Sequence, residues 1–228
     1  MNQCLICDQR LEMKSSWRSL FLLIKEKKIC EECEQQFKLL TGPICTVCGR
    51  MTEEPVCSDC SRWQNQPEWK DTLVCNRSTY EYNDFMKEVL AAFKYRGDAE
   101  LVYVFKYAFE NTFKKYFQEN DMIVPIPSSK ERLYERGFNQ AKLLAECLDL
   151  SIYEPITRLH HEKQSKKSRQ ERIQTKNVFQ MTSPSAISNQ NILLIDDLYT
   201  TGTTLRHAAK ILLEHGAKSV SSLTLIRS

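Results

Sequence analysis

The chain has 228 residues, 42% of them hydrophobic, and a formal net charge of +3. This length allows one mid-sized core and a small appendage. No apolar run is long enough to span a bilayer, and the first residues, Met1-Asn2-Gln3-Cys4, lack the charged and apolar regions of a signal peptide. We therefore expect a cytoplasmic protein without a membrane span.

Eight of the ten cysteines lie in the first 60 residues, as four CxxC pairs. Two such pairs make a closed site of four thiolates, which is typical of structural zinc in a reducing compartment. We therefore expect two structural Zn²⁺ ions, held by Cys4, Cys7, Cys30, Cys33, Cys45, Cys48, Cys57 and Cys60. A disulfide scaffold is disfavoured without a secretory signal, whereas spacing alone leaves an iron–sulfur cluster open. Sequential pairing of the CxxC motifs is the simpler arrangement, and a cross-braced one is also compatible with the spacing.

The cysteine-rich segment offers little core of its own, because about 60 residues interrupted by charges bury little apolar surface. Bound zinc contributes on the order of 10 kcal/mol to such segments, so we expect a strong chelator to unfold it. The polar stretch from Ser61 to Pro67 has the composition of a linker. These features predict a zinc-binding module at residues 1–66 and a second domain at residues 67–228.

Alternating strands and helices are predicted beyond the linker. The first half holds one or two strands in Leu73 to Tyr82, a helix in Phe85 to Phe93, and a longer helix with Leu101, Phe105, Ala108, Phe109, Phe113 and Phe117 on one face. The second half holds strands at Met122 to Pro127, Pro155 to Leu159, Ile192 to Ile195 and Val220 to Ile226, and helices at Phe138 to Leu148 and Leu205 to Leu213. This order predicts an α/β fold with a mostly parallel sheet flanked by helices. Ligands bind at the carboxyl ends of the strands in such sheets.

Basic residues gather in two places between these elements. Arg132 and Arg136 follow the strand that starts at Met122, and arginine suits multi-donor contact with phosphate oxygens. Between Leu159 and Val178 the chain carries six Lys/Arg, two Glu and almost no apolar residue, so this segment should be mobile. A solvated loop is the alternative for the first group. For the second, a lid over a site and a solvated or nucleic-acid-contacting arm are both open.

The most informative motif follows the strand at Ile192 to Ile195. Asp196 and Asp197 end that strand, and a turn containing Thr200, Thr201, Gly202, Thr203 and Thr204 leads into the next helix. The N–H groups and dipole at a helix N-terminus attract phosphate, and a glycine lets the backbone approach it. The two carboxylates can accept hydrogen bonds from the hydroxyls of a ribose. Walker A and dinucleotide-binding patterns are absent, and an ordinary strand-turn-helix is the alternative.

This motif resembles the phosphoribosyl-pyrophosphate (PRPP) signature of type I phosphoribosyltransferases. That resemblance implies a Mg²⁺-dependent PRPP site in which Asp196 and Asp197 are the catalytic carboxylates, the threonine-rich turn binds phosphate, and Arg132 and Arg136 grip the pyrophosphate. It also implies a flexible loop, matching residues 160–177, that closes over the site.

The whole layout is similar to the ComF family. The resemblance is carried by the CxxC pairs, Lys94-Tyr95-Arg96-Gly97, Val124-Pro125-Ile126-Pro127, Arg136-Gly137-Phe138-Asn139-Gln140 and the Asp196 motif. It implies a role in DNA uptake during natural transformation, with single-stranded DNA and a DNA-translocating helicase as partners.

Charge helps to locate the expected DNA contacts. Residues 1–69 carry nine Lys/Arg and ten Asp/Glu, and eight thiolates make this part more negative still. DNA contacts are therefore expected in the other domain, at Lys94, Arg96, Lys163, Lys166, Lys167, Arg169 and Arg172. Two alternatives remain open: a metabolic phosphoribosyltransferase with an unknown acceptor and no DNA role, and a non-catalytic nucleotide or PRPP sensor.

Overall fold

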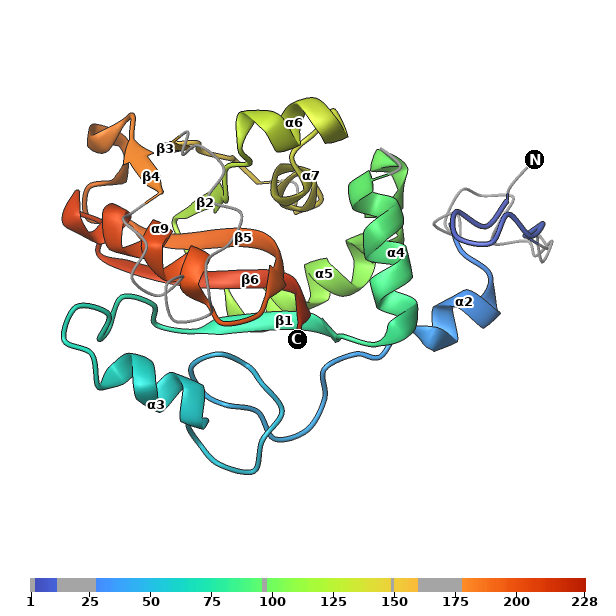
Figure 1. Ribbon diagram of the computed structural model, residues 1–228, viewed down its shortest axis with the longest axis horizontal. Coiled ribbons are helices and arrows are strands. Elements are labelled where there is room, and N and C mark those ends of the chain that lie inside the picture. Colours follow the sequence, from blue (N-terminus) through green and yellow to red (C-terminus); the bar gives the residue numbers. More distant parts are fainter. Residues whose placement is uncertain (1–2, 12–27, 96–97, 149, 160–177) are drawn as a thin grey trace.

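A four-stranded parallel sheet forms the centre of the computed structural model, which describes residues 3–11, 28–95, 98–148, 150–159 and 178–228. In spatial order its strands are β1 (Asn76–Glu81), β6 (Ser219–Arg227), β5 (Asn191–Tyr199) and β2 (Met122–Pro125). All three neighbouring pairs run parallel, and β5 and β6 occupy the middle (Figure 1). The predicted parallel sheet is confirmed.

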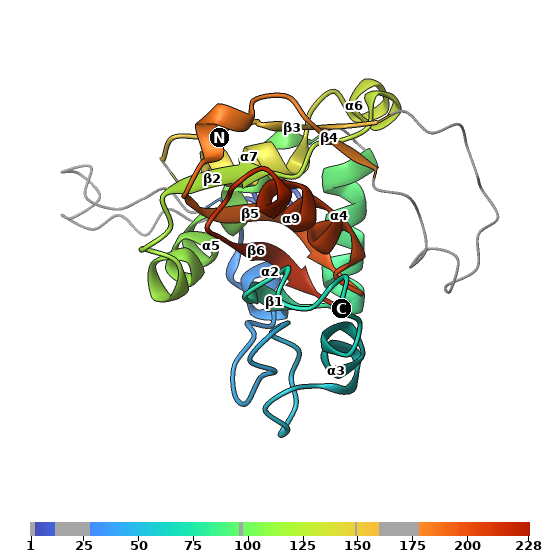
Figure 2. The same cartoon turned by 90° about the vertical axis from the view of Figure 1, so that its left-hand side faces the viewer.

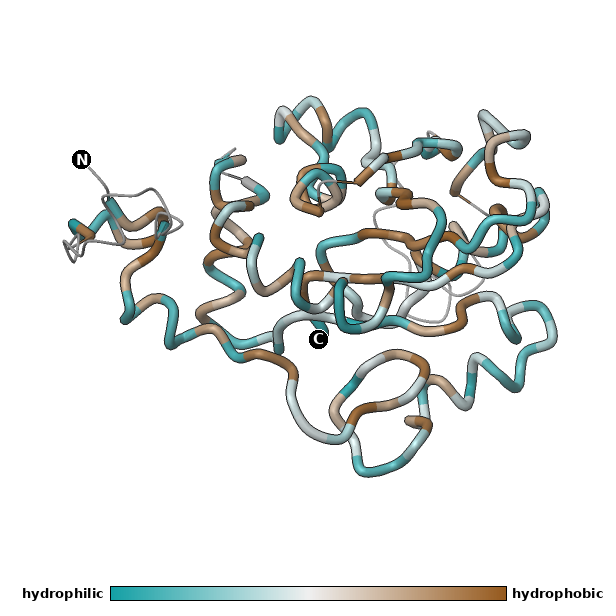
Figure 3. Tube along the Cα trace, turned by 180° about the vertical axis from the view of Figure 1, so that it is seen from behind, coloured by the Kyte–Doolittle hydropathy of each residue, from teal (hydrophilic) through white to brown (hydrophobic). Residues whose placement is uncertain are grey.

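Helices cover both faces of this sheet. On one face lie α4 (Asp84–Tyr95), α5 (Val102–Tyr116), which the 3-10 helix η1 (Ala99–Leu101) precedes, and the apolar side of α7 (Gln140–Glu146). On the other face lies α9 (Thr203–Glu214). Side chains alternate along β5, so Leu193 and Ile195 pack against the first group and Ile192 and Leu194 against α9. A strand buried on both faces must be continuously apolar, and hydrophobic residues accordingly gather in the central strands (Figure 3).

Two local structures differ from the sequence-based expectation. The stretch at Pro155 to Leu159 contains a strand, β3 (Ile156–Arg158), but it pairs antiparallel with β4 (Phe179–Met181), outside the parallel sheet. The basic stretch after β2 is a helix, α6 (Lys130–Arg136), instead of a loop. Its end signals were present in the sequence: the Ser129 hydroxyl accepts a hydrogen bond from the Arg132 N–H at 3.3 Å, and Gly137 ends the helix at φ +79°.

The predicted linker at Ser61 to Pro67 is wrong in its first half, because Ser58–Gln64 forms helix α3. Composition misled here: the stretch is polar, yet its one tryptophan, Trp63, is buried and packs on Trp69 at a ring separation of 5.6 Å. The helix lies under the sheet, close to the chain's C-terminus (Figure 2). The domain boundary at residue 66 stays a prediction.

The other two helices of the described residues are α2 (Glu31–Gln36) and the 3-10 helix η2 (Pro184–Ile187). None of the described helices combines the length and the apolar character needed to cross a bilayer.

Candidate functional site

The two carboxylates of the motif lie on the carboxyl half of β5, which continues two residues beyond them to Tyr199. Asp197 forms an ion pair with Lys94, at the end of α4, and both side chains are largely buried, with 14% and 17% of their surfaces exposed. Lys94 was expected at a DNA-binding surface. The structure places its ammonium group among the carboxylates, and its contact with DNA stays a prediction.

Asp196 has a raised affinity for a proton. Burial raises its pKa to about 7, and the neighbouring charge of Asp197 acts in the same direction. The backbone N–H of Asp197, which donates to Asp196 Oδ1 at 2.9 Å, and the charge of Lys94 only partly oppose this. A ligand that donates hydrogen bonds to this carboxylate would therefore compete with a proton near neutral pH.

The threonine turn (residues 200–204) connects β5 to α9. Gly202 stands before the first helical residue, Thr203, with φ +79°, and the hydroxyls of Thr201 and Thr203 are hydrogen-bonded at 2.8 Å. In the described residues, no backbone acceptor pairs with the N–H groups of Thr200, Thr201 or Gly202. The turn thus presents donors at the positive end of a 12-residue helix, which suits an anion.

Gly202 is required by packing as well as by conformation. A Cβ on this residue would lie 2.2 Å from the Tyr199 hydroxyl oxygen and 2.5 Å from Tyr199 Cζ, and the phenol itself is buried. From the sequence, Gly202 is expected only to let a phosphate approach the backbone. The structure adds that the turn lies directly on a buried ring.

Arg158 on β3 interacts electrostatically with both Asp196 and Arg132. Burial lowers the pKa of Arg158 on β3, the positive charge of Arg132 lowers it further, and the negative charge of Asp196 opposes both effects. Arg158 is therefore close enough to Arg132 and to Asp196 for its charge to interact with each of theirs. Arg136, at the end of α6, donates to Gln140 Oε1 at 3.0 Å.

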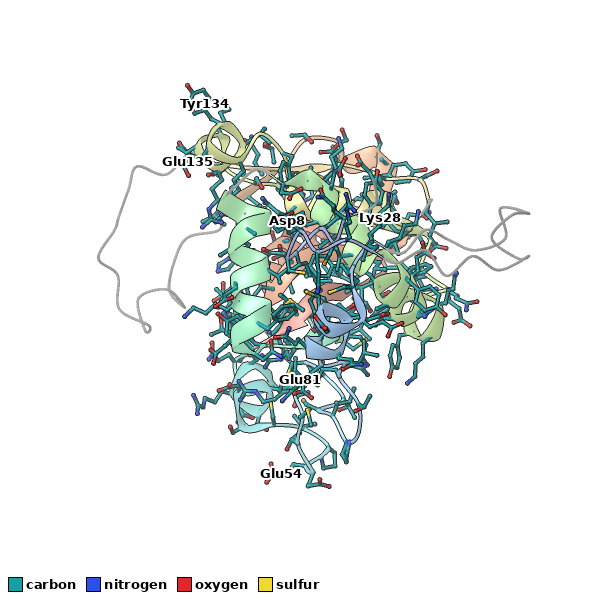
Figure 4. The ribbon with its side chains drawn as sticks, turned by 90° about the vertical axis from the view of Figure 1, so that its right-hand side faces the viewer. Asp8, Lys28, Glu54, Glu81, Tyr134 and Glu135 are labelled. Atoms are coloured by element: carbon teal, nitrogen blue, oxygen red, sulfur yellow. The ribbon has the colours of Figure 1, made fainter. Side chains whose placement is uncertain are left out.

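Sequence reasoning missed Arg158, although a cation at the end of a strand and just before a basic segment was a usable signal. Arg96 and the basic residues Lys163, Lys166, Lys167, Arg169 and Arg172 lie outside the described residues. The outer surface of α6 points away from the sheet: Tyr134 and Glu135 project from the edge of the molecule (Figure 4), and Tyr134 is 92% exposed.

The cysteines form two groups of four whose sulfur atoms all lie within 4.8 Å of one another. The first cysteine cluster is Cys4, Cys7, Cys30 and Cys33, and the second cysteine cluster is Cys45, Cys48, Cys57 and Cys60. Sequential grouping is therefore the arrangement in the structure. Sulfur pairs such as Cys48–Cys57, at 3.6 Å, match the separation of about 3.8 Å that tetrahedral Zn–S bonds of about 2.3 Å require. Both clusters could hold a metal ion, and zinc is consistent with them.

The two clusters differ in their surroundings. The first has an exposed member, Cys7, and belongs to a small apolar group with Ile29 at one end of the molecule (Figure 1). All four cysteines of the second cluster are at most 5% exposed and belong to the hydrophobic core between β5 and α9.

Comparison with known proteins agrees with this architecture. The family model described as the phosphoribosyl transferase domain matches residues 100–228. Competence protein ComFC of Bacillus subtilis (strain 168) is 51% identical over 99% of this chain and 95% of its own length. Competence protein ComFC of Streptococcus pneumoniae (strain ATCC BAA-255 / R6) is 31% identical over 99% of this chain and its full length.

A third relative, competence protein F of Haemophilus influenzae, is 25% identical over 91% of this chain and 93% of its own length. The family model covers more than half of the chain, and the Bacillus subtilis relative aligns with nearly all of it. The chain therefore belongs to the ComF family of proteins with a phosphoribosyltransferase domain.

Proposed function

We propose that this protein binds Mg²⁺–PRPP at the carboxyl end of β5 and acts in the uptake and processing of transforming single-stranded DNA. The observation that carries the PRPP site is the junction of two carboxylates with a turn of unpaired N–H groups at the start of α9. The DNA role is supported by the relatives, which are named competence proteins and align along nearly the whole chain. A DNA-uptake helicase is the protein partner that this role implies.

In this proposal, different residues bind different parts of PRPP. Asp196 and Asp197 accept hydrogen bonds from the ribose hydroxyls, and the threonine turn donates N–H groups to a phosphate. Arg132 binds the pyrophosphate in this proposal, and Arg158 is added to it because its charge interacts with those of Arg132 and Asp196. Mg²⁺ bound with the ligand would offset the negative charge that develops on the pyrophosphate. No covalent nucleophile from the protein is needed, because departure of pyrophosphate depends on charge stabilisation.

Lys94 changes partner in this scheme. Without ligand, its ammonium group neutralises Asp197, which would otherwise be an unpaired carboxylate in a largely buried place. Ribose hydroxyls that bind Asp197 free Lys94 to approach the phosphates.

The direct test is calorimetry with PRPP, with and without Mg²⁺, on the wild type and on the double variant Asp196→Asn/Asp197→Asn. We expect Mg²⁺-dependent binding by the wild type and a loss of at least 100-fold in the variant, because two hydrogen-bonded charged acceptors contribute about 1.5–3 kcal/mol each. Asp71→Asn is the matched control: Asp71 is exposed in a turn at φ 59°, a conformation that asparagine tolerates. Equal affinities in all three proteins would contradict the site.

The pH dependence of binding gives a second test. With a pKa of about 7 for Asp196, the carboxylate that the ribose needs is lost as pH falls through 7, so PRPP affinity should drop about tenfold between pH 8 and pH 6. Asp196→Asn should remove this step and leave only the titration of the ligand's own phosphates. A wild-type profile that is parallel to that of Asp196→Asn would show that Asp196 does not govern binding.

Two further measurements separate the alternatives. Release of pyrophosphate from PRPP with a panel of nucleobases distinguishes a transferase from a sensor.

Titration of single-stranded DNA at several salt concentrations tests the DNA role, and we expect the affinity for DNA to fall steeply with salt. Joint neutralisation of Lys163, Lys166, Lys167, Arg169 and Arg172 should weaken DNA binding and leave calorimetric PRPP affinity within a few fold. Unchanged DNA affinity in that variant would exclude the basic segment as the contact surface.

A further inference from the structure

The second cysteine cluster contacts the threonine turn through helix α3. Trp63, three residues after Cys60, donates its indole N–H to the Thr201 carbonyl oxygen at 3.0 Å. The same helix is held against α9 by aromatic contacts, with Trp69 between Trp63 and His207 at ring separations of 5.6 and 4.7 Å. The turn is therefore attached to the cysteine-rich segment on one side.

A second contact comes from Arg227, the last residue of β6, whose side chain is buried. Its Nη1 donates to the carbonyl oxygens of Tyr199 and Thr200, each at 3.2 Å. Its Nη2 donates to the sulfur of Cys48 at 3.5 Å. A single guanidinium group thus connects a member of the second cysteine cluster to the start of the threonine turn.

These bonds determine where the N–H groups of the turn point. In a planar trans peptide the C=O and N–H bonds point in opposite directions. The carbonyls of Tyr199, Thr200 and Thr201 are all bound by groups on the side of the second cysteine cluster. The N–H groups of Thr200, Thr201 and Gly202 consequently face away from that cluster, and these are the donors assigned to the ligand phosphate.

A metal-loaded second cysteine cluster would offset the buried positive charges of this region. Arg206 and Arg227 are buried cations with 2% and 5% of their surfaces exposed. Arg206 stacks over the ring of Trp63 at 5.0 Å, and its Nε and Nη2 atoms have no hydrogen-bond partner in the described structure. Buried cations need nearby negative charge. Four thiolates around one divalent ion keep a net charge of about −2, which would offset both arginines.

We propose that the second cysteine cluster is a functional part of the phosphate site: with metal bound, it anchors Arg227, and Arg227 acts as a positioning residue that holds the N–H donors of the threonine turn toward PRPP. The PRPP half of this statement rests on the proposed function. Because coupling between two binding sites is reciprocal at equilibrium, bound PRPP should in turn raise the affinity of this cluster for its metal ion. The first cysteine cluster, which lies apart from the turn, should show no such response.

The test compares metal retention in the full-length protein loaded with ¹¹³Cd²⁺, whose two four-thiolate sites give separate NMR signals. Cys7→Ser identifies the signal of the first cluster. We expect Mg²⁺–PRPP to raise the concentration of a competing chelator that removes the second signal at equilibrium, with no change for the first. Arg227→Gln should abolish that protection and weaken calorimetric PRPP binding about 10- to 100-fold. Arg62→Gln is the control: Arg62 is exposed on the same helix as Trp63, pairs with Asp59 at 3.5 Å, and should behave like the wild type.

Amide hydrogen exchange of the threonine turn provides a readout that needs no ligand. Exchange at residues 200–202 should accelerate in Arg227→Gln and, more weakly, in Trp63→Phe, which removes a single N–H donor and serves if Arg227→Gln does not fold. Exchange unchanged in the folded variants would overturn the coupling, whether or not PRPP binds. Accelerated exchange with no PRPP binding by the wild type would uphold the structural coupling and overturn the proposed function instead.

Discussion

Replacement of Gly202 by alanine should lower the free energy of unfolding by about 2–5 kcal/mol and abolish PRPP binding. Two destabilising effects combine in this variant. The backbone at φ +79° is unfavourable for any residue with a Cβ by about 1–2 kcal/mol. The added methyl group would also overlap the buried Tyr199 ring, and overpacking of this kind typically costs about 1–3 kcal/mol. Relief of the overlap must move either the ring or the turn, and Tyr199 directly precedes the turn that carries the phosphate donors.

Gly137 provides a closely matched control. It has the same φ of +79° at the end of α6, and a Cβ there would meet no atom within 4 Å. Gly137→Ala should therefore show only the conformational cost of about 1–2 kcal/mol and keep PRPP affinity within a few fold. Urea denaturation and calorimetry on both variants measure the difference. Equal destabilisation by the two substitutions would mean that contact with Tyr199 does not determine the shape of the turn.

The sequence predicted the parallel sheet because its signals are local. Ile192 to Ile195 is a short apolar run between polar residues, and the helix after it ends at Glu214, two residues before Gly216. A strand buried on both faces leaves such a run in the sequence, whereas a helix that packs one face leaves apolar residues at helical spacing. The same local reasoning placed Asp196, Asp197 and the threonine turn next to one another.

What the sequence did not predict depends on contacts between distant residues. The polarity of Ser61 to Pro67 suggested a linker, because nothing nearby shows that Trp63 is bound to Thr201, 138 residues further along. Arg227 is the last residue of strand β6 and belongs to no recognisable sequence motif, yet its side chain connects Cys48 to the threonine turn. Lys94 was read as a surface cation, since its partner Asp197 is about a hundred residues away in sequence. The residues within a motif predict which groups it can bind. The distant residues that contact the motif depend on how the chain folds.

Loss of the second cysteine cluster should unfold the phosphate site, whereas loss of the first should not. Cys45→Ser removes one ligand from a cluster whose cysteines belong to the core between β5 and α9, and structural zinc contributes on the order of 10 kcal/mol. We expect one bound zinc instead of two, a large drop in thermal stability and no PRPP binding. Cys7→Ser should also lose one zinc, but its cluster belongs to a separate, smaller apolar group, so PRPP binding should persist.

Cys147→Ser is the control for the replacement of a buried thiol by a hydroxyl. Cys147 is 4% exposed in the core on the opposite face of the sheet and belongs to neither cluster, so this variant measures the cost of placing a hydroxyl where a buried thiol stood. That cost should be about 1–3 kcal/mol and should leave both zinc ions in place. Zinc content, thermal unfolding and PRPP titration on the three variants give the comparison. If Cys45→Ser and Cys7→Ser reduced PRPP affinity equally, the second cluster would have no special connection to the phosphate turn, and the two clusters would act only by stabilising the chain.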